Sequence, residues 1–272
     1  MMRILLLAPT ASSLYSRAVA HLIQAEPGME ISAVVVRRIF NWRRLRSELR
    51  RDGPRLVSKV REKLILGERS YDPHDPETMG AFIQSIGMPG GTLPADARRF
   101  DIPCLVVPDH NHPRVLELLR RKQPDLVVFT GGGLLRKPLL DLAGRGVLNC
   151  HSGILPRYRG MDVVEWPLLE PGEPAIGLTT HWMDAGVDTG PILRQLRVEL
   201  RPGDSFEGIR RRMEPRMPEL VLQTLRGLRD GSLDAKPQDP GAGRQYFVMH
   251  PRLQTAAAIR LRRLTGSTRS EA

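Results

Sequence analysis

The sequence predicts an α/β fold with a mostly parallel central sheet. Two apolar runs and a helical pattern between them, all within residues 3–36, support this prediction. Residues 3–8 and 30–36 are apolar runs of strand length, and residues 14–25 between them have apolar side chains at helical spacing. Ser12 or Ser13 can cap that helix, because a serine oxygen accepts the free N–H groups of a first turn. A strand, a helix and a strand of these lengths are typical of a parallel βαβ unit.

Later segments extend this pattern. Residues 103–108 and 125–130 are further apolar runs, and residues 113–122 between them have helical spacing. Residues 194–199 alternate in polarity, which indicates a strand at an edge or in a hairpin. Residues 205–228 predict a helix, although two prolines inside it conflict with a continuous one. The first strand is not followed by G-x-G-x-x-G, so the sequence predicts no dinucleotide site.

The net charge of +11 is concentrated in residues 37–69 and 251–272. A basic protein can bind nucleic acid, a membrane surface or phosphorylated metabolites, but basic side chains also form ordinary solvated helix faces. Aromatic residues make up only 5% of the chain, and no RNA-binding motif accompanies the charge. The charge therefore does not predict a polynucleotide partner.

The length of 272 residues fits one large domain at residues 1–248 and a basic tail at residues 249–272. No apolar run approaches the roughly 18 residues of a membrane helix, so we expect no membrane span. The two cysteines, Cys104 and Cys150, both lie in strand-like runs. They predict buried, reduced thiols and a cytoplasmic location.

Three polar residues are the candidates for chemistry. Asn149 and His151 are two residues apart in what reads as extended chain, so their side chains share one face, and Cys150 points to the other. A second apolar run, residues 176–180, leads to Asp188, which reaches the other two if the runs pair. An amide and an imidazole can donate to an oxygen that becomes negative, while a carboxylate orients the imidazole. Each residue alone also has a structural interpretation, as a packed histidine or a turn former.

Other histidines do not predict a metal site. His74 lies between two aspartates in a proline-broken loop, and no further His or Cys stands at ligand spacing beside it. His110 and His112 form an H-x-H pair just before the helix of residues 113–122. A capped turn is the simpler account of that pair.

The three candidates belong to a longer ordered series of motifs. The series is Asn149-Cys150-His151-Ser152, Ile154-Leu155-Pro156, Tyr158-Arg159-Gly160, Gly177 with Thr179, and Gly186-Val187-Asp188-Thr189-Gly190-Pro191-Ile192. It resembles the N-x-H-x-S-L-L-P and D-x-G-x-I loops of the folate-dependent formyltransferases, which formylate methionyl-tRNA, glycinamide ribonucleotide or amino sugars. Gly153 stands where the motif has serine. The likeness extends more weakly over residues 2–36, 103–192 and 237–246.

This resemblance implies a three-layer Rossmann-like formyltransferase fold with a helical insertion at about residues 40–98, after the second strand. It gives Asn149, His151 and Asp188 the catalytic positions, with 10-formyltetrahydrofolate as donor and no metal. The residues it assigns to the folate are Gly133, Leu134, Leu135, Met183, Asp184, Ala185, Gly186 and Val187. The glycines at 131–133 depart from the family, which usually has bulkier residues there.

The resemblance also indicates a small-molecule amine as acceptor. The residues expected to bind it are Tyr158, Arg159, Gly160, Met161, Asp162 and Trp166, and Arg157 and Arg159 are candidates to meet a phosphate. The residues after 248 are too few for the C-terminal barrel of methionyl-tRNA formyltransferases, which favours a nucleotide-linked amino sugar. The alternatives are formyltetrahydrofolate hydrolysis, transfer to methionyl-tRNA or glycinamide ribonucleotide, and a non-enzymatic folate- or nucleotide-binding module. A homodimer is left open.

Overall fold

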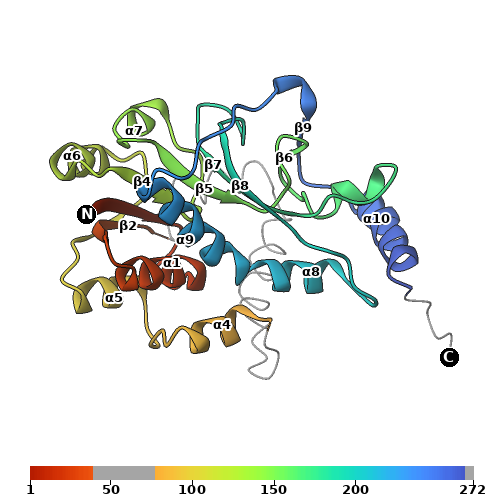
Figure 1. Cartoon of the computed structure of the whole chain (residues 1–272), viewed down its shortest axis with the longest axis horizontal. Coiled ribbons are helices and arrows are strands. Elements are labelled where there is room, and N and C mark those ends of the chain that lie inside the picture. Colours follow the sequence, from red (N-terminus) through yellow and green to blue (C-terminus); the bar gives the residue numbers. More distant parts are fainter. Residues whose placement is uncertain (39–76, 267–272) are drawn as a thin grey trace.

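The structure is a computed structural model that describes residues 1–38 and 77–266. Its central sheet has seven strands in the order β3-β2-β1-β4-β5-β7-β8 (Figure 1). The strands are β1 (Met2–Ala8), β2 (Met29–Arg37), β3 (Cys104–Val107), β4 (Leu126–Phe129), β5 (Val147–His151), β7 (Gly177–Trp182) and β8 (Ile192–Arg197). The ladder from β3 to β5 is parallel, whereas β7 and β8 are antiparallel additions. The mostly parallel α/β sheet predicted from the sequence is confirmed.

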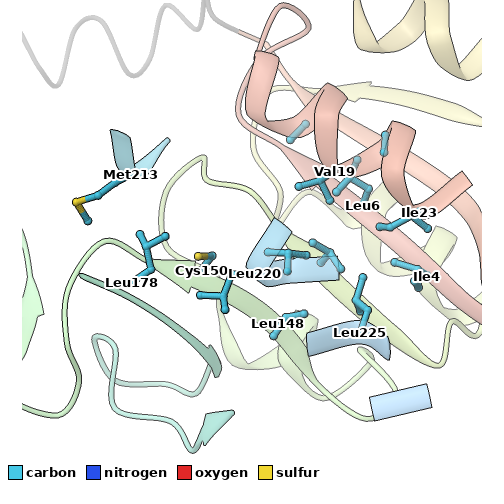
Figure 2. Close-up of a cluster of buried hydrophobic side chains, with 14 of the residues drawn as sticks. Ile4, Leu6, Val19, Ile23, Leu148, Cys150, Leu178, Met213, Leu220 and Leu225 are labelled. Carbon is cyan, nitrogen blue, oxygen red and sulfur yellow. The ribbon is translucent and has the colours of Figure 1, made fainter. Parts of the chain in front are cut away.

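Helices cover both faces of the sheet, which gives three layers. On one face, α1 (Leu14–Ala25) and α9 (Arg216–Arg229) pack side by side, as Figure 1 shows. They bury the main core cluster, drawn in Figure 2, with Ile4 and Leu6 of β1. On the other face, α6 (Pro113–Lys122) and α7 (Lys137–Leu140) pack with the alternate side chains of β1, Leu5 and Leu7. The alternation along β1 therefore separates two apolar cores.

Residues 205–228 form two helices, which resolves the conflict between the predicted helix and the two prolines inside it. The first is α8 (Phe206–Met213), whose N-cap Ser205 accepts the N–H of Gly208, as predicted. The second is α9, which begins after Pro215 and has Pro218 in its first turn. Proline is tolerated there because the first N–H groups of a helix have no helical partner. The two prolines thus mark a helix start.

Two shorter helices fall in the segment predicted as an insertion, α4 (Met79–Ser85) and α5 (Leu93–Arg99). The amphipathic helix expected at residues 40–66 and the loop with His74 lie outside the described residues. Across residues 1–38 and 77–266, no helix is both long and apolar enough to cross a membrane.

A small second sheet stands beside the main one, with β6 (Tyr158–Gly160) parallel to β9 (Arg244–Tyr246). The 3₁₀ turn η2 (Pro240–Ala242) precedes β9. After it, α10 (Pro251–Leu264) packs against the 3₁₀ turn η1 (Trp166–Leu169). Ala257 and Leu261 of α10 join the main core cluster. The residues predicted as a basic tail thus include a helix that contributes to the core.

The turn before α6 is a capped turn, as predicted. His112 is the N-cap of α6 and accepts the N–H of Arg114, while His110 is buried and bonds the Ala8 carbonyl through Nε2 at 3.1 Å. Among the described residues, no group of His, Cys, Asp or Glu is arranged to hold a metal. Burial lowers the pKa of His110 to about 4, although the Ala8 bond offsets part of the shift. The ring is therefore neutral near pH 7.

Shortening a core side chain of α9 should destabilise the protein. Leu225 is fully buried in the main core cluster, so Leu225→Ala should lower the free energy of unfolding by about 2–5 kcal/mol. Leu253 on α10 is 42% exposed, and Leu253→Ala should cost well under half as much. Urea unfolding followed by circular dichroism measures both. Equal losses in the two variants would contradict the placement of α9.

His110 should make the stability fall in acid. Its pKa is lower in the folded than in the unfolded chain, so below about pH 6.5 the unfolded state binds more protons and stability decreases as the pH falls. Between pH 6.5 and 4 the loss from this group is roughly 3 kcal/mol. Urea unfolding at several pH values should show a shallower decline for His110→Gln. A decline as steep in His110→Gln as in the wild type would contradict this role of His110.

Candidate active site

The pairing of β5 with β7 places the first two candidate residues. Asn149 and His151 lie opposite His181 and Thr179 in an antiparallel register. Cys150 points to the other face, into the main core cluster, where Figure 2 shows it. Burial raises the pKa of its thiol to about 12, so it stays protonated. The packing role expected for Cys150 is confirmed.

His151 is 7% exposed, and both of its ring nitrogens have defined neighbours. Its Nε2 lies 2.9 Å from the Tyr158 carbonyl oxygen. Because a carbonyl only accepts, Nε2 carries a proton, and the neutral ring has its lone pair on Nδ1. Nδ1 lies 3.5 Å from Oδ2 of Asp188. Burial lowers the pKa of His151, and the Asp188 carboxylate offsets part of this, so the ring is neutral near pH 7.

Asp188 lies in the loop between β7 and β8. Its Oδ2 accepts the Gly160 N–H at 2.9 Å. Its φ of +54° is unusual for a residue with a side chain and needs support from the surroundings. Gln238 gives that support, because its Nε2 donates to the Asp188 and Gly190 carbonyls at 3.0 and 2.5 Å. The structure thus brings together the three candidate residues.

Asp188 is ionised at neutral pH. Burial by itself raises the pKa of this carboxyl group, but the charge that His151 can carry and the Gly160 N–H that the carboxylate accepts work in the opposite direction. The pKa of Asp188 therefore lies below its usual value. A buried carboxylate is then available to stabilise a positive imidazole.

His181 is a site residue that sequence reasoning missed. It is 1% exposed, and its Nε2 lies 3.2 Å from Nδ2 of Asn149 and 3.5 Å from Oδ1 of Asp188. Its Nδ1 lies 2.9 Å from the Trp182 carbonyl. The sequence signal was that His181 directly follows the second apolar run, but only the register shows that it faces Asn149.

The glycine segment after β4 was predicted to contact folate. Leu134 is 74% exposed there, but Leu135 is buried in the core beneath α6 and α7, so its side chain is not displayed to a ligand. A Cβ on Gly132 would lie 2.6 Å from the His110 ring. The His110 ring therefore occupies the space that a bulkier residue would need, which explains the glycine at this position.

The loop from Met183 to Val187 was also assigned to folate. The N–H of Met183 donates to the Val147 carbonyl at 2.8 Å, which ties the start of the loop to β5. Asp184 accepts the Gly186 N–H at 3.0 Å and the Thr189 hydroxyl at 2.6 Å. The Asp184 side chain thus shapes the turn, and the exposed tip is Asp184, Ala185 and Gly186.

Tyr158 was predicted to bind the acceptor, but its side chain is only 1% exposed. Its hydroxyl donates to Glu170 at 2.9 Å, and Tyr246 donates to the same carboxyl group at 2.6 Å. Arg157, a candidate phosphate ligand, pairs with Glu170 as well, at 2.6 Å. These side chains hold the small sheet together, so in this structure Tyr158 is a packing residue.

Other predicted acceptor residues bond to the chain on either side of β9. The bonds join Arg159 Nη2 to the Gly243 carbonyl at 3.1 Å, the Met249 N–H to Asp162 at 2.7 Å, and Trp166 Nε1 to the Phe247 carbonyl at 3.0 Å. Met161 is different, because its side chain is 54% exposed. Gly160 has φ +95° and approaches Tyr246 so closely that a Cβ would lie 2.1 Å from the Tyr246 carbonyl. The predicted segment therefore builds a wall whose exposed member is Met161.

Comparison with known sequences agrees with the motifs. The formyl transferase family matches residues 97–225. The chain is 38% identical over 144 residues to methionyl-tRNA formyltransferase of Trichlorobacter lovleyi, a match that covers 53% of this chain and 45% of that protein. The chain thus spans less than half the length of this relative.

Solved structures share the fold. Glycinamide ribonucleotide transformylase 1 from Symbiobacterium toebii superposes with a TM-score of 0.57 at 22% identity, over 88% of this chain and 95% of that one. A Mycobacterium tuberculosis protein described as a candidate sugar N-formyltransferase gives a TM-score of 0.57 at 19% identity, over 100% of this chain and 90% of that one. The sequence match and the ordered motifs make residues 97–225 similar to the formyltransferase family, and the solved structures show that the fold is shared.

Proposed function

We propose that the protein is an N-formyltransferase that moves a formyl group from 10-formyltetrahydrofolate to a primary amine of a small acceptor. The observation that carries the proposal is the convergence of Asn149, His151 and Asp188 within the family-matched segment. An amide, an imidazole and a carboxylate are the groups that direct acyl transfer needs when no nucleophilic side chain takes part.

The proposed reaction begins when the neutral amine attacks the formyl carbon, which turns the formyl oxygen into an oxyanion. Asn149 donates an N–H to that oxygen. Nδ1 of His151 takes the proton that the amine loses and then also donates to the oxyanion, while Asp188 stabilises the positive ring. When the bond from the formyl carbon to the folate nitrogen breaks, His151 returns the proton to that nitrogen. The proton count therefore balances without an external base.

The proposed donor site uses features at two adjacent loops. Exposed Leu134 offers an apolar surface, and Asn111 holds its carbonyl by donating at 2.9 Å. The main chain of residues 183–187 offers peptide donors and acceptors, which suit the polar edge of a pterin. Gly133, which has φ +104°, precedes Leu134 in the first loop, and we include it in the proposed donor site.

A nucleotide-linked amino sugar is the acceptor we propose. Phe247 is 68% and Val248 60% exposed, and they follow Tyr246, whose carbonyl accepts the N–H of Met161. The exposed Phe247 ring, close in the chain to the residues that bond the predicted acceptor segment, suits stacking on a base. The T. lovleyi relative is named for methionyl-tRNA, so that acceptor is tested as well.

The free thiols of Cys104 and Cys150 are consistent with the cytoplasm, which is the compartment we propose.

Transfer requires an amine, and this separates it from hydrolysis. The protein is incubated with 10-formyltetrahydrofolate alone or with a nucleotide-linked amino sugar, glycinamide ribonucleotide or methionyl-tRNA, and tetrahydrofolate is measured by chromatography. We expect release with an amine acceptor, fastest with the amino sugar, and a formylated product in equal amount. Equal release in water would instead establish a hydrolase, and binding without release would establish a folate-binding module.

Removal of either oxyanion donor should slow turnover strongly without unfolding the protein. Asn149→Ala and His151→Ala should each lower kcat by about 100- to 1000-fold, the loss typical of one oxyanion-hole donor. The control is His21→Ala on α1, on the other face of the sheet, where the ring bonds the Ile86 carbonyl. Steady-state kinetics below the unfolding temperature should show near wild-type kcat for the control. Near-normal kcat in both site variants would refute the mechanism.

A further inference from the structure

We infer that His181 is a positioning residue that accepts one N–H of the Asn149 carboxamide and so directs the second N–H to the formyl oxygen. This inference rests on the proposed function, because it assigns the orientation of a group that the reaction uses. It adds a second histidine to the site, which acts through Asn149 and not on the substrate.

The location of His181 is set by the sheet. It lies on β7 directly opposite Asn149 on β5, and its side chain is 1% exposed. Its ring stands perpendicular to that of His151, with the centroids 6.4 Å apart. The strand register and the burial of the side chain therefore keep the ring beside Asn149.

The protonation of the His181 ring follows from its main-chain contact. Nδ1 lies 2.9 Å from the Trp182 carbonyl oxygen, which can only accept, so Nδ1 carries a proton. In the neutral ring, Nε2 then has a lone pair, and it lies 3.2 Å from Nδ2 of Asn149. With the amide turned over, its oxygen would face that lone pair and repel it. Neutral His181 therefore selects the orientation in which the NH₂ group of Asn149 faces the ring.

Asp188 connects this ring to the rest of the site. Oδ1 of Asp188 lies 3.5 Å from Nε2 of His181, the ring nitrogen that also faces Asn149, and the ring of His151 stands beside it. The bond from Asn149 needs the lone pair on Nε2, because a proton there would bond to the carboxylate instead.

Two substitutions of His181 distinguish the effect of its hydrogen-bond acceptor from the effect of its side-chain volume. His181→Gln can place an amide oxygen near the position of Nε2, and this oxygen does not titrate. His181→Leu fills space without an acceptor. We expect kcat to fall at least about tenfold for His181→Leu and less than about threefold for His181→Gln, with KM for the amine nearly unchanged.

A double-mutant cycle tests whether His181 acts through Asn149. In an Asn149→Ala background, His181→Leu should change kcat less than about twofold, because the group it positions is absent. The control is His21→Gln, which should leave kcat at the wild-type value. Thermal unfolding checks each variant, and His181→Phe replaces His181→Leu in the cycle if the latter does not fold.

The outcomes distinguish this inference from the proposed function. Additive losses in the cycle, or a His181→Gln variant as slow as His181→Leu with an intact fold, would overturn the inference alone. Loss of turnover in Asn149→Ala with normal turnover in His181→Leu would do the same. If the wild-type protein releases no formyl group with any amine, the proposed function fails and the inference fails with it.

Discussion

The antiparallel pairing of β5 with β7 is the constraint on which the candidate active site depends. The ladder up to β5 is parallel, and β7 is the first strand to run against it. This register places His181 opposite Asn149, and the following loop folds back so that Asp188 reaches His151 and the Gly160 N–H. A slip of one residue would turn the polar side chains of β7 toward the apolar core. The buried core on the opposite face, with Cys150, therefore protects the register.

Two main-chain carbonyls determine how protons are distributed in the site. The Tyr158 carbonyl holds the Nε2 proton of His151, and the Trp182 carbonyl holds the Nδ1 proton of His181. Nδ1 of His151 and Nε2 of His181 each lie 3.5 Å from the Asp188 carboxylate. The carboxylate can stabilise a proton added to His151. This arrangement suits a reaction that takes a proton from an amine and returns it to a leaving nitrogen.

The sequence predicts this fold well where local pattern decides structure. Apolar runs and caps located the strands and α1, and the period of two along β5 separated Cys150 from Asn149 and His151. It predicts less where tertiary contacts decide. Whether Leu135 or Tyr158 faces a ligand or the core depends on elements distant in sequence, and so does the contact of His181 with Asn149. Sequence alternation restricts a side chain to one of two faces, but it does not show what covers that face.

In the proposed function, different parts of the chain supply the chemistry and the recognition of the acceptor. Asn149, His151 and Asp188 all lie inside the family-matched residues 97–225. Residues 243–249 lie outside that match. They bond to the segment predicted to bind the acceptor, residues 158–166, and reach the site through the pairing of β9 with β6. The likeness to known formyltransferases therefore bears on the transfer step more than on the amine. Because Gly160 both pairs with Tyr246 and donates to Asp188, a change in the acceptor segment is transmitted to the carboxylate through one residue. Under the proposed function, acceptor specificity can thus vary in this segment while the three residues proposed to perform the transfer stay the same.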